Sequence, residues 1–113
     1  MIKDIIANLS VTKNDSVVYA ASVAAAFQAH LTGVAFVYDP IVPISDGGYI
    51  PPEVIETQRA DNQAAAESAI KSFTAASNRV EISAEPLTLS ASLAGAGDRF
   101  ARMARRFDIA IVG

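Results

Sequence analysis

The sequence contains no cysteine, no tryptophan and a single histidine. Without cysteine there can be no disulfide and no thiolate metal site, which fits a reducing compartment. No apolar run approaches the ~20 residues that a membrane helix needs. The N-terminal residues also lack the basic region and apolar run of a signal peptide. We therefore expect a cytoplasmic protein with no membrane partner.

Positive charge is scarce as well. Nine Lys and Arg stand against 12 Asp and Glu, which gives a net charge of −3 and a pI of about 4.9. A nucleic-acid partner would need a basic face to neutralise phosphates, so none is expected. The hydrophobic share of 51% excludes a disordered chain. Its 113 residues fit one domain, residues 1 to 113.

Three segments are predicted to be helical. Residues 17 to 30 are rich in alanine and contain neither proline nor glycine, and their apolar positions recur at helical spacing. Residues 51 to 77 begin with two prolines and a glutamate, which suit a first turn. Residues 98 to 106 form a shorter helix with Asp98 as a plausible cap. His30 is expected at the end of the first helix.

The apolar segments between these helices predict strands. Residues 5 to 9, taken alone, fit either a strand or a helix. Residues 31 to 38 indicate a buried strand, and residues 107 to 113 a second strongly apolar one. Residues 79 to 84 alternate in polarity and predict a half-solvated strand that ends before Pro86. The order βαβαβαβ predicts an α/β fold: an open, doubly wound parallel sheet with helices on both faces.

Three segments resemble the universal stress protein family. Residues 3 to 10 are similar to its first strand, residues 29 to 39 to its second strand, and residues 107 to 113 to the fourth strand, which enters the nucleotide loop. The resemblance spans the whole chain through the order and spacing of these pieces. It implies a flavodoxin-like fold with the strand order 3-2-1-4-5, a role in stress response, and homodimers as the common state.

One branch of that family binds ATP through a glycine motif after the fourth strand. Gly113 fits the first glycine of this motif, and the family's fifth strand and last helix have no counterpart in the sequence. The resemblance therefore implies a chain truncated before the phosphate loop, with ATP as a possible cofactor of the full-length protein and none for these 113 residues. A proteolytic product and a part of a longer or tandem protein both remain open.

The candidate binding site lies where the strands end. Ligands of open parallel sheets bind at the carboxyl ends of strands, near the switch in strand order. This places Leu9 and Ser10, Val37, and Val112 with Gly113 around one crevice. The resemblance implies that Val37 and Val112 flank the adenine.

The sequence departs from the family pattern at two positions of this candidate site. Ser10 stands where ATP-binding members carry an aspartate, and Asn8 stands where the family often has proline. A serine has no carboxylate to clamp a ribose. Structural explanations compete: Ser10 can begin a polar turn, and Val37 can belong to the core. Gly113 can be an ordinary glycine at a strand end.

The remaining features of the sequence do not indicate a catalytic or metal-binding site. The single histidine cannot make a zinc site, and no triad partner is identifiable, so we expect no catalytic residue. The segment from 40 to 52, rich in proline and glycine, predicts a flap over the crevice. Four arginines lie on part of the surface of the last predicted helix: Arg99, Arg102, Arg105 and Arg106. They could form a phosphate-binding patch, but in an acidic chain a solvated helix face is the better interpretation.

Three functions fit these observations. The leading hypothesis is a binding or regulatory module of the universal stress protein type, acting as a homo-oligomer, most simply a dimer. The second is an ATP-binding protein with slow ATPase activity, whose phosphate loop follows residue 113. The third is a purely structural dimerisation or interaction domain.

Overall fold

Four strands and three helices alternate along the chain in the computed structural model, which describes residues 2–9, 14–39, 51–92 and 94–112. The elements are β1 (Asp4–Asn8), α1 (Asn14–Phe27), β2 (His30–Tyr38), α2 (Pro52–Arg79), β3 (Ala84–Ala91), α3 (Ala96–Ala104) and β4 (Ile109–Val112). The strands lie in the order β3-β2-β1-β4, and all neighbours are parallel. This confirms the predicted sheet and the first four places of the expected strand order.

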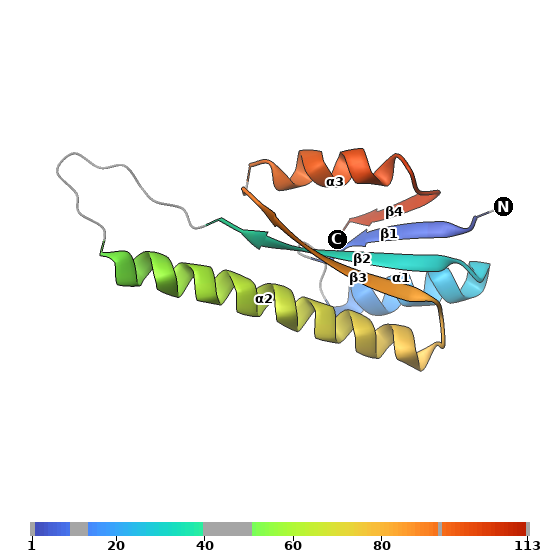
Figure 1. Ribbon diagram of the computed structural model, residues 1–113. Helices are drawn as coiled ribbons and strands as arrows, with labels where there is room; N and C mark the ends of the chain where they lie inside the picture. The colour runs from blue at the N-terminus through green and yellow to red at the C-terminus, as the bar shows by residue number, and fades with distance from the viewer. Residues whose placement is uncertain (1, 10–13, 40–50, 93, 113) are drawn as a thin grey trace.

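The helices cover both faces of the sheet. Figure 1 shows α1 and α2 on one side and α3 on the other. Alternate residues of β1 serve the two faces: Ile5 and Ala7 belong to the core under α1 and α2, while Ile6 belongs to the core under α3. β2 is divided in the same way. Because both faces are covered, the central strands are almost continuously apolar, which is the pattern that made them predictable.

α2 packs closely on β2 at one glycine. A Cβ on Gly33 would lie 2.7 Å from the ring of Phe73, which is only 1% exposed. The aromatic ring of α2 therefore occupies the space that a side chain of β2 would otherwise fill. This contact fixes the distance between the longest helix and the centre of the sheet.

The strand predicted over residues 79 to 84 is wrong. α2 continues to Arg79, and β3 runs from Ala84 to Ala91 with Pro86 inside it. Proline is tolerated because β3 is bonded to β2 alone among the described strands. Leu31 N–H donates to the Ser83 carbonyl at 2.9 Å, so by alternation the nitrogen of Pro86 faces the open side.

The alternation that suggested a strand there has another cause. Val80 and Ile82 lie in the turn between α2 and β3 and pack against the core under α1 and α2. Their polar neighbours face solvent. A tight turn over a core edge therefore imitates the period of a strand.

Two further boundaries differ from the predictions. His30 begins β2 instead of ending a helix, because α1 stops at Phe27 and Gln28 takes a left-handed conformation with φ 51°. α3 begins at Ala96 instead of Asp98, which makes no cap and instead pairs with Arg102 at 3.0 Å. None of the described helices combines the length and the apolar character that crossing a membrane requires.

Asp108 ties the start of β1 to the turn before β4. Its carboxylate accepts hydrogen bonds from the backbone N–H groups of Lys3 at 2.8 Å and Asp4 at 3.0 Å. Its own N–H donates to the Asp4 carbonyl at 2.8 Å. The two bonds to the carboxylate favour its ionised form and lower the pKa of Asp108 below the ordinary value of 3.8.

We expect Gly33→Ala to destabilise the protein by about 1–3 kcal/mol, the usual cost of overpacking a core. The reason is that the added methyl group would lie 2.7 Å from the buried ring of Phe73, so that the ring or the helix has to shift. Urea unfolding followed by circular dichroism measures the change. Gly97→Ala is the matched control, because a Cβ at Gly97 meets no atom within 4 Å. Equal stability of the two variants would contradict the proposed close contact, and Phe73→Leu should partly rescue Gly33→Ala.

We expect Asp108→Asn to lower the melting temperature near neutral pH and to lose this effect in acid. A lowered folded-state pKa contributes stability that is present above the unfolded pKa and disappears as the pH falls through the folded value. The difference from the unmodified protein should therefore shrink below about pH 4. Melting curves from pH 2 to 7 test this, with Asp61→Asn on the exposed side of α2 as control. A difference that is constant over this range would contradict the assignment.

Candidate functional site

The strand order reverses at β1. The chain passes from β1 through α1 and α2 to β2 and β3 on one side, and then returns through α3 to β4 on the other side of β1. The connection that follows β1, α1, and the connection that leads into β4, α3, therefore lie on opposite faces of the sheet (Figure 1). Such a reversal is where open parallel sheets bind ligands, outside the carboxyl ends of the strands.

Asn8 forms the centre of this edge. It ends β1 and is paired with Val34 of β2 on one side and Val112 of β4 on the other. Asn8 is 6% exposed and Val112 is 61% exposed. Because paired residues of neighbouring strands face the same side, both lie on the α3 side with Val34. The structure thus brings together two of the predicted site residues.

Leu9 lies next to them but faces the other way. Its N–H donates to the Val34 carbonyl at 2.8 Å, and its side chain belongs to the core under α1 and α2. Leu9 can therefore contribute backbone atoms to the crevice, while its side chain supports α1. Ser10 and Gly113 lie outside the described residues.

Val37 lies further along the sheet. β1 ends opposite Val34, and Val37 follows three residues later on β2, about 10 Å along the strand. It is paired with Ser90 of β3 and packs against the core under α1 and α2. The structure therefore does not place Val37 directly beside Asn8 and Val112. The cause is the difference in strand length, because β2 has nine residues and β1 has five.

Two side chains that the sequence did not single out for this edge hold its outer part. Asn62 of α2 donates from Nδ2 to the Tyr38 carbonyl at 2.8 Å, and Arg99 of α3 donates from Nη1 to the Ser90 carbonyl at 2.7 Å. They fix the ends of β2 and β3 to helices on opposite faces. Asparagine is unfavourable inside a helix, so its presence within α2 was the only feature of the sequence that could have indicated a special role for Asn62. Arg102 is exposed, as the prediction of a solvated helix face stated. Arg99 is exposed as well, but its guanidinium group also binds the Ser90 carbonyl.

At this edge Val112 offers an exposed apolar side chain beside Asn8, which is 6% exposed. No group of three or more His, Cys, Asp and Glu side chains within the described ranges is arranged to hold a metal ion. The segment predicted as a flap, residues 40 to 52, falls outside the described part except for its last two residues.

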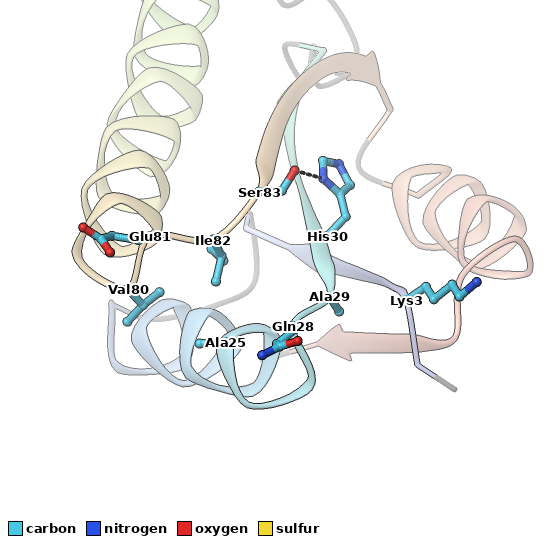
Figure 2. A pocket seen from close by; sticks show the side chains of 9 residues that line it. All are labelled: Lys3, Ala25, Gln28, Ala29, His30, Val80, Glu81, Ile82 and Ser83. Atoms are coloured by element: carbon cyan, nitrogen blue, oxygen red, sulfur yellow. Dashed lines mark hydrogen bonds between the residues drawn. The ribbon is translucent and has the colours of Figure 1, made fainter.

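A hollow of 530 Å³ lies at the opposite, amino end of the sheet, between the end of α1 and the turn from α2 to β3. Figure 2 shows apolar Ala25, Ala29, Val80 and Ile82 among its lining residues. No motif in the sequence pointed to it. It depends on where two helices end, which the predicted boundaries missed.

His30 has partners beside this hollow. Its Nδ1 lies 2.7 Å from the Ser83 hydroxyl, and its Nε2 lies 3.7 Å from a carboxylate oxygen of Glu85. The first distance is a hydrogen bond and the second is too long for one. The imidazole is therefore not oriented by a carboxylate as in a catalytic triad. It joins the starts of β2 and β3 across the sheet edge.

Comparison with known proteins identifies the fold. No protein-family model and no curated sequence matches the chain. Among solved structures, a universal stress family protein from Burkholderia pseudomallei superimposes with a TM-score of 0.64 at 20% identity, covering 99% of this chain and 82% of that chain. Universal stress protein UspA from Lactobacillus plantarum gives 0.66 at 15% identity, covering 97% and 75%.

A third similar structure is a universal stress protein in complex with cAMP, with a TM-score of 0.59, 14% identity, and 99% and 76% coverage. At such low identities the likeness concerns the fold. The chain has the universal stress protein fold, as its sequence led us to expect.

Proposed function

We propose that this protein is a binding module of the universal stress protein type that holds an adenine nucleotide at the carboxyl ends of β1 and β4, as part of a stress response. The observation that carries the proposal is the reversal of strand order at β1, which sets Asn8 and Val112 side by side at the sheet edge. The complex of one structural neighbour with cAMP supports the choice of ligand class. The proposal includes no chemical step.

The chemistry of the crevice suits a nucleobase. Val112 exposes an apolar side chain beside the carboxamide of Asn8. An aromatic base needs an apolar surface on which to lie and a few directional hydrogen bonds at its edge. The amino ends of α1 and α3 also lie at this edge of the sheet, and the partial positive charge of helix amino ends favours phosphate groups.

The affinity is expected to be low. Ser10 offers one hydrogen bond where a carboxylate would clamp both ribose hydroxyls. Contacts of the base alone support binding at about millimolar concentration. A module of this affinity reports high nucleotide levels and does not retain nucleotide through purification.

Adding a negative charge to the crevice provides the test. We expect Val112→Glu to weaken AMP and ATP binding by about fivefold or more, because the new carboxylate repels phosphate. Titration of the ¹⁵N-labelled protein, followed through the amides of Asn8, Leu9 and Val112, measures the dissociation constant. Val54→Glu, at an exposed valine on α2, is the matched control and should bind as the unmodified protein does.

Two outcomes of the same titration would contradict the proposal. Nucleotide shifts confined to other parts of the sheet would place the ligand elsewhere. Low-micromolar ATP binding would show that a stronger phosphate site exists, and it would favour the alternative of an ATP-binding protein with slow ATPase activity.

One observation favours a second function, that of a structural dimerisation domain. Within the described part of the sheet, β4 is bonded to β1 on one side only, and Ile109, Ala110, Ile111 and Val112 carry no charge. Open apolar edges recruit further strands, because their N–H and C=O groups lack partners. Pairing of two such edges about a two-fold axis would give a homodimer with a continuous sheet.

We expect the protein to sediment as a dimer at micromolar concentration. Ala110→Lys should weaken the dimer by about tenfold or more, since 1.4 kcal/mol of charge burial suffices for that change. Ala101→Lys, on the exposed side of α3, is the control for the added charge. Circular dichroism must show that both variants are folded. A single monomeric species of the unmodified protein in analytical ultracentrifugation would rule out the association.

A further inference from the structure

Cationic side chains gather at the end of α3. Four of the nine Lys and Arg residues of the chain lie in this short segment: Arg99, Arg102, Arg105 and Arg106. Together with two aspartates they give residues 98 to 108 a charge of +2, which leaves −5 for the remainder of a chain whose net charge is −3. The partial charge of a helix carboxyl end is about half a unit, so it does not account for four arginines.

The neighbouring carboxylates neutralise this charge only in part. Arg102 pairs with Asp98 at 3.0 Å, and the carboxylate of Asp108 accepts hydrogen bonds from backbone N–H groups at the start of β1. The side chains of Arg105 and Arg106 have no ion-pair or hydrogen-bond partner among the residues that the structure describes. The end of α3 therefore keeps uncompensated positive charge.

An apolar groove opens beside these arginines. Its volume is 280 Å³, and the described residues that line it are Arg102, Met103, Arg106 and Phe107, none of which is acidic. Met103 and Phe107 pack against the core under α3, so the floor of the groove is held in place. Arg, Met and Phe are all enriched in protein–protein interfaces. This surface, the α3 groove, suits an apolar side chain that is accompanied by carboxylates.

The chain carries a projecting segment at the start of α2. Asn62 is bonded to Tyr38, the last residue of β2, so residues 52 to 61 extend about 15 Å past that strand. No residue of α2 before Ala66 is buried. Figure 1 shows this segment, the α2 tip, projecting beyond the ends of β2 and β3.

One side of the α2 tip is both acidic and apolar. Because each helical residue turns by about 100°, Glu53, Thr57 and Asp61 form one row along the helix. Val54, which is 46% exposed, lies seven residues before Asp61 and borders this row. Arg59, the one cation in the sequence of the tip, lies on the opposite side of the helix. The row therefore presents an apolar side chain with two carboxylates and no cation.

The α2 tip and the α3 groove are complementary surfaces of one chain. One offers negative charge beside a valine, and the other offers positive charge beside an apolar floor. Figure 1 shows the α2 tip and the end of α3 at opposite ends of the molecule, so a tip cannot reach the groove of its own chain. A second copy of the chain supplies both features that the groove suits.

We propose that the α3 groove binds the α2 tip of a second copy of this chain. Val54 enters the groove and contacts Met103 and Phe107. The carboxylates of Glu53 and Asp61 then lie beside the arginines of the groove. Two copies that exchange tips form a closed dimer. This contact is separate from the nucleotide crevice and from the pairing of β4 edges.

Amide shifts at rising protein concentration locate the contact. A small interface of this kind should dissociate at about 0.1 mM, so spectra of the ¹⁵N-labelled protein from about 0.01 to about 1 mM cover its range. The amides of Val54, Thr57, Met103 and Phe107 should shift together, and about 0.5 M salt should reverse the shifts because it screens exposed charges. Shifts confined to residues 109 to 112 would indicate edge pairing alone. That result, or the absence of any shift, would overturn the proposal.

Reversal of one charge on each surface tests the partnership. Asp61→Arg on the tip and Arg106→Glu in the groove should each weaken the association about fivefold or more, because each replaces an attraction with a repulsion of similar size. An equimolar mixture of the two variants should associate more tightly than either variant alone. In the mixture, the unmodified groove meets the unmodified tip, and the reversed groove meets the reversed tip. Failure of the mixture to recover association would contradict the proposal.

Matched variants control for charge and for apolar area. Glu67→Arg and Arg79→Glu reverse exposed charges of α2 outside the tip and should leave the association unchanged. Val54→Ser should weaken it about threefold or more, because it removes apolar surface from the contact. Val18→Ser, at a valine of α1 that is 48% exposed, should have no effect. Circular dichroism must show that every variant is folded. If the two reversals and Val54→Ser associate as tightly as the unmodified protein, the proposal fails.

Discussion

The contact between Phe73 and Gly33 determines much of the architecture. Because β2 has no side chain at Gly33, the ring of Phe73 reaches the backbone of the central strand and fixes α2 against it. The buried residues of α2 are confined to its second half, from Ala66 to Ser77. The helix is thus held firmly near its carboxyl end, and that end places the turn into β3. The first half of α2 is tied to the sheet by the bond from Asn62 to the end of β2.

The proposed nucleotide site follows from one asymmetry of parallel α/β folds. Each strand-helix-strand unit directs the amino end of its helix to the carboxyl edge of the sheet and the carboxyl end to the opposite edge. One edge therefore gathers the positive ends of the helix dipoles and the other edge the negative ends. This distribution of charge favours a phosphate-bearing ligand at the edge where Asn8 lies.

The sequence predicted what depends on periodicity and order. The βαβ alternation defined the sheet, and the rule for ligand sites in such sheets placed Leu9 and Val112 at one edge. Asn8 was singled out only through the family resemblance. The prediction failed over residues 79 to 84, where turn residues contacting the core imitate a strand. It also failed at Pro86, which is acceptable only because β3 is an edge strand, and edge position is a tertiary property.

The sequence also failed to indicate several residues near these sites, again because their roles depend on tertiary structure. Asn62 and Arg99 bind carbonyl groups that are remote in sequence, so no local pattern reports them. The left-handed residues Gln28 and Glu81 carry no signature, because glycine, the usual marker of that conformation, is absent at both positions. The hollow between the ends of α1 and α2 depends on the exact bounds of both helices, which the sequence pattern did not give.

The unequal lengths of the strands set the shape of the carboxyl edge of the sheet. β1 ends at Asn8, whereas β2 continues to Tyr38 with β3 beside it, which Figure 1 shows as a ribbon extending past β1. Two contacts support this extension: the rings of Phe36 and Tyr38 stack with centroids 6.4 Å apart, and Arg99 donates to the Ser90 carbonyl. Val37 lies on this extension, and its side chain packs against the core under α1 and α2. Asn8 and Val112 face the α3 side with Val34, so the side chain of Val37 does not face them, and the distance of about 10 Å along β2 separates it from them further.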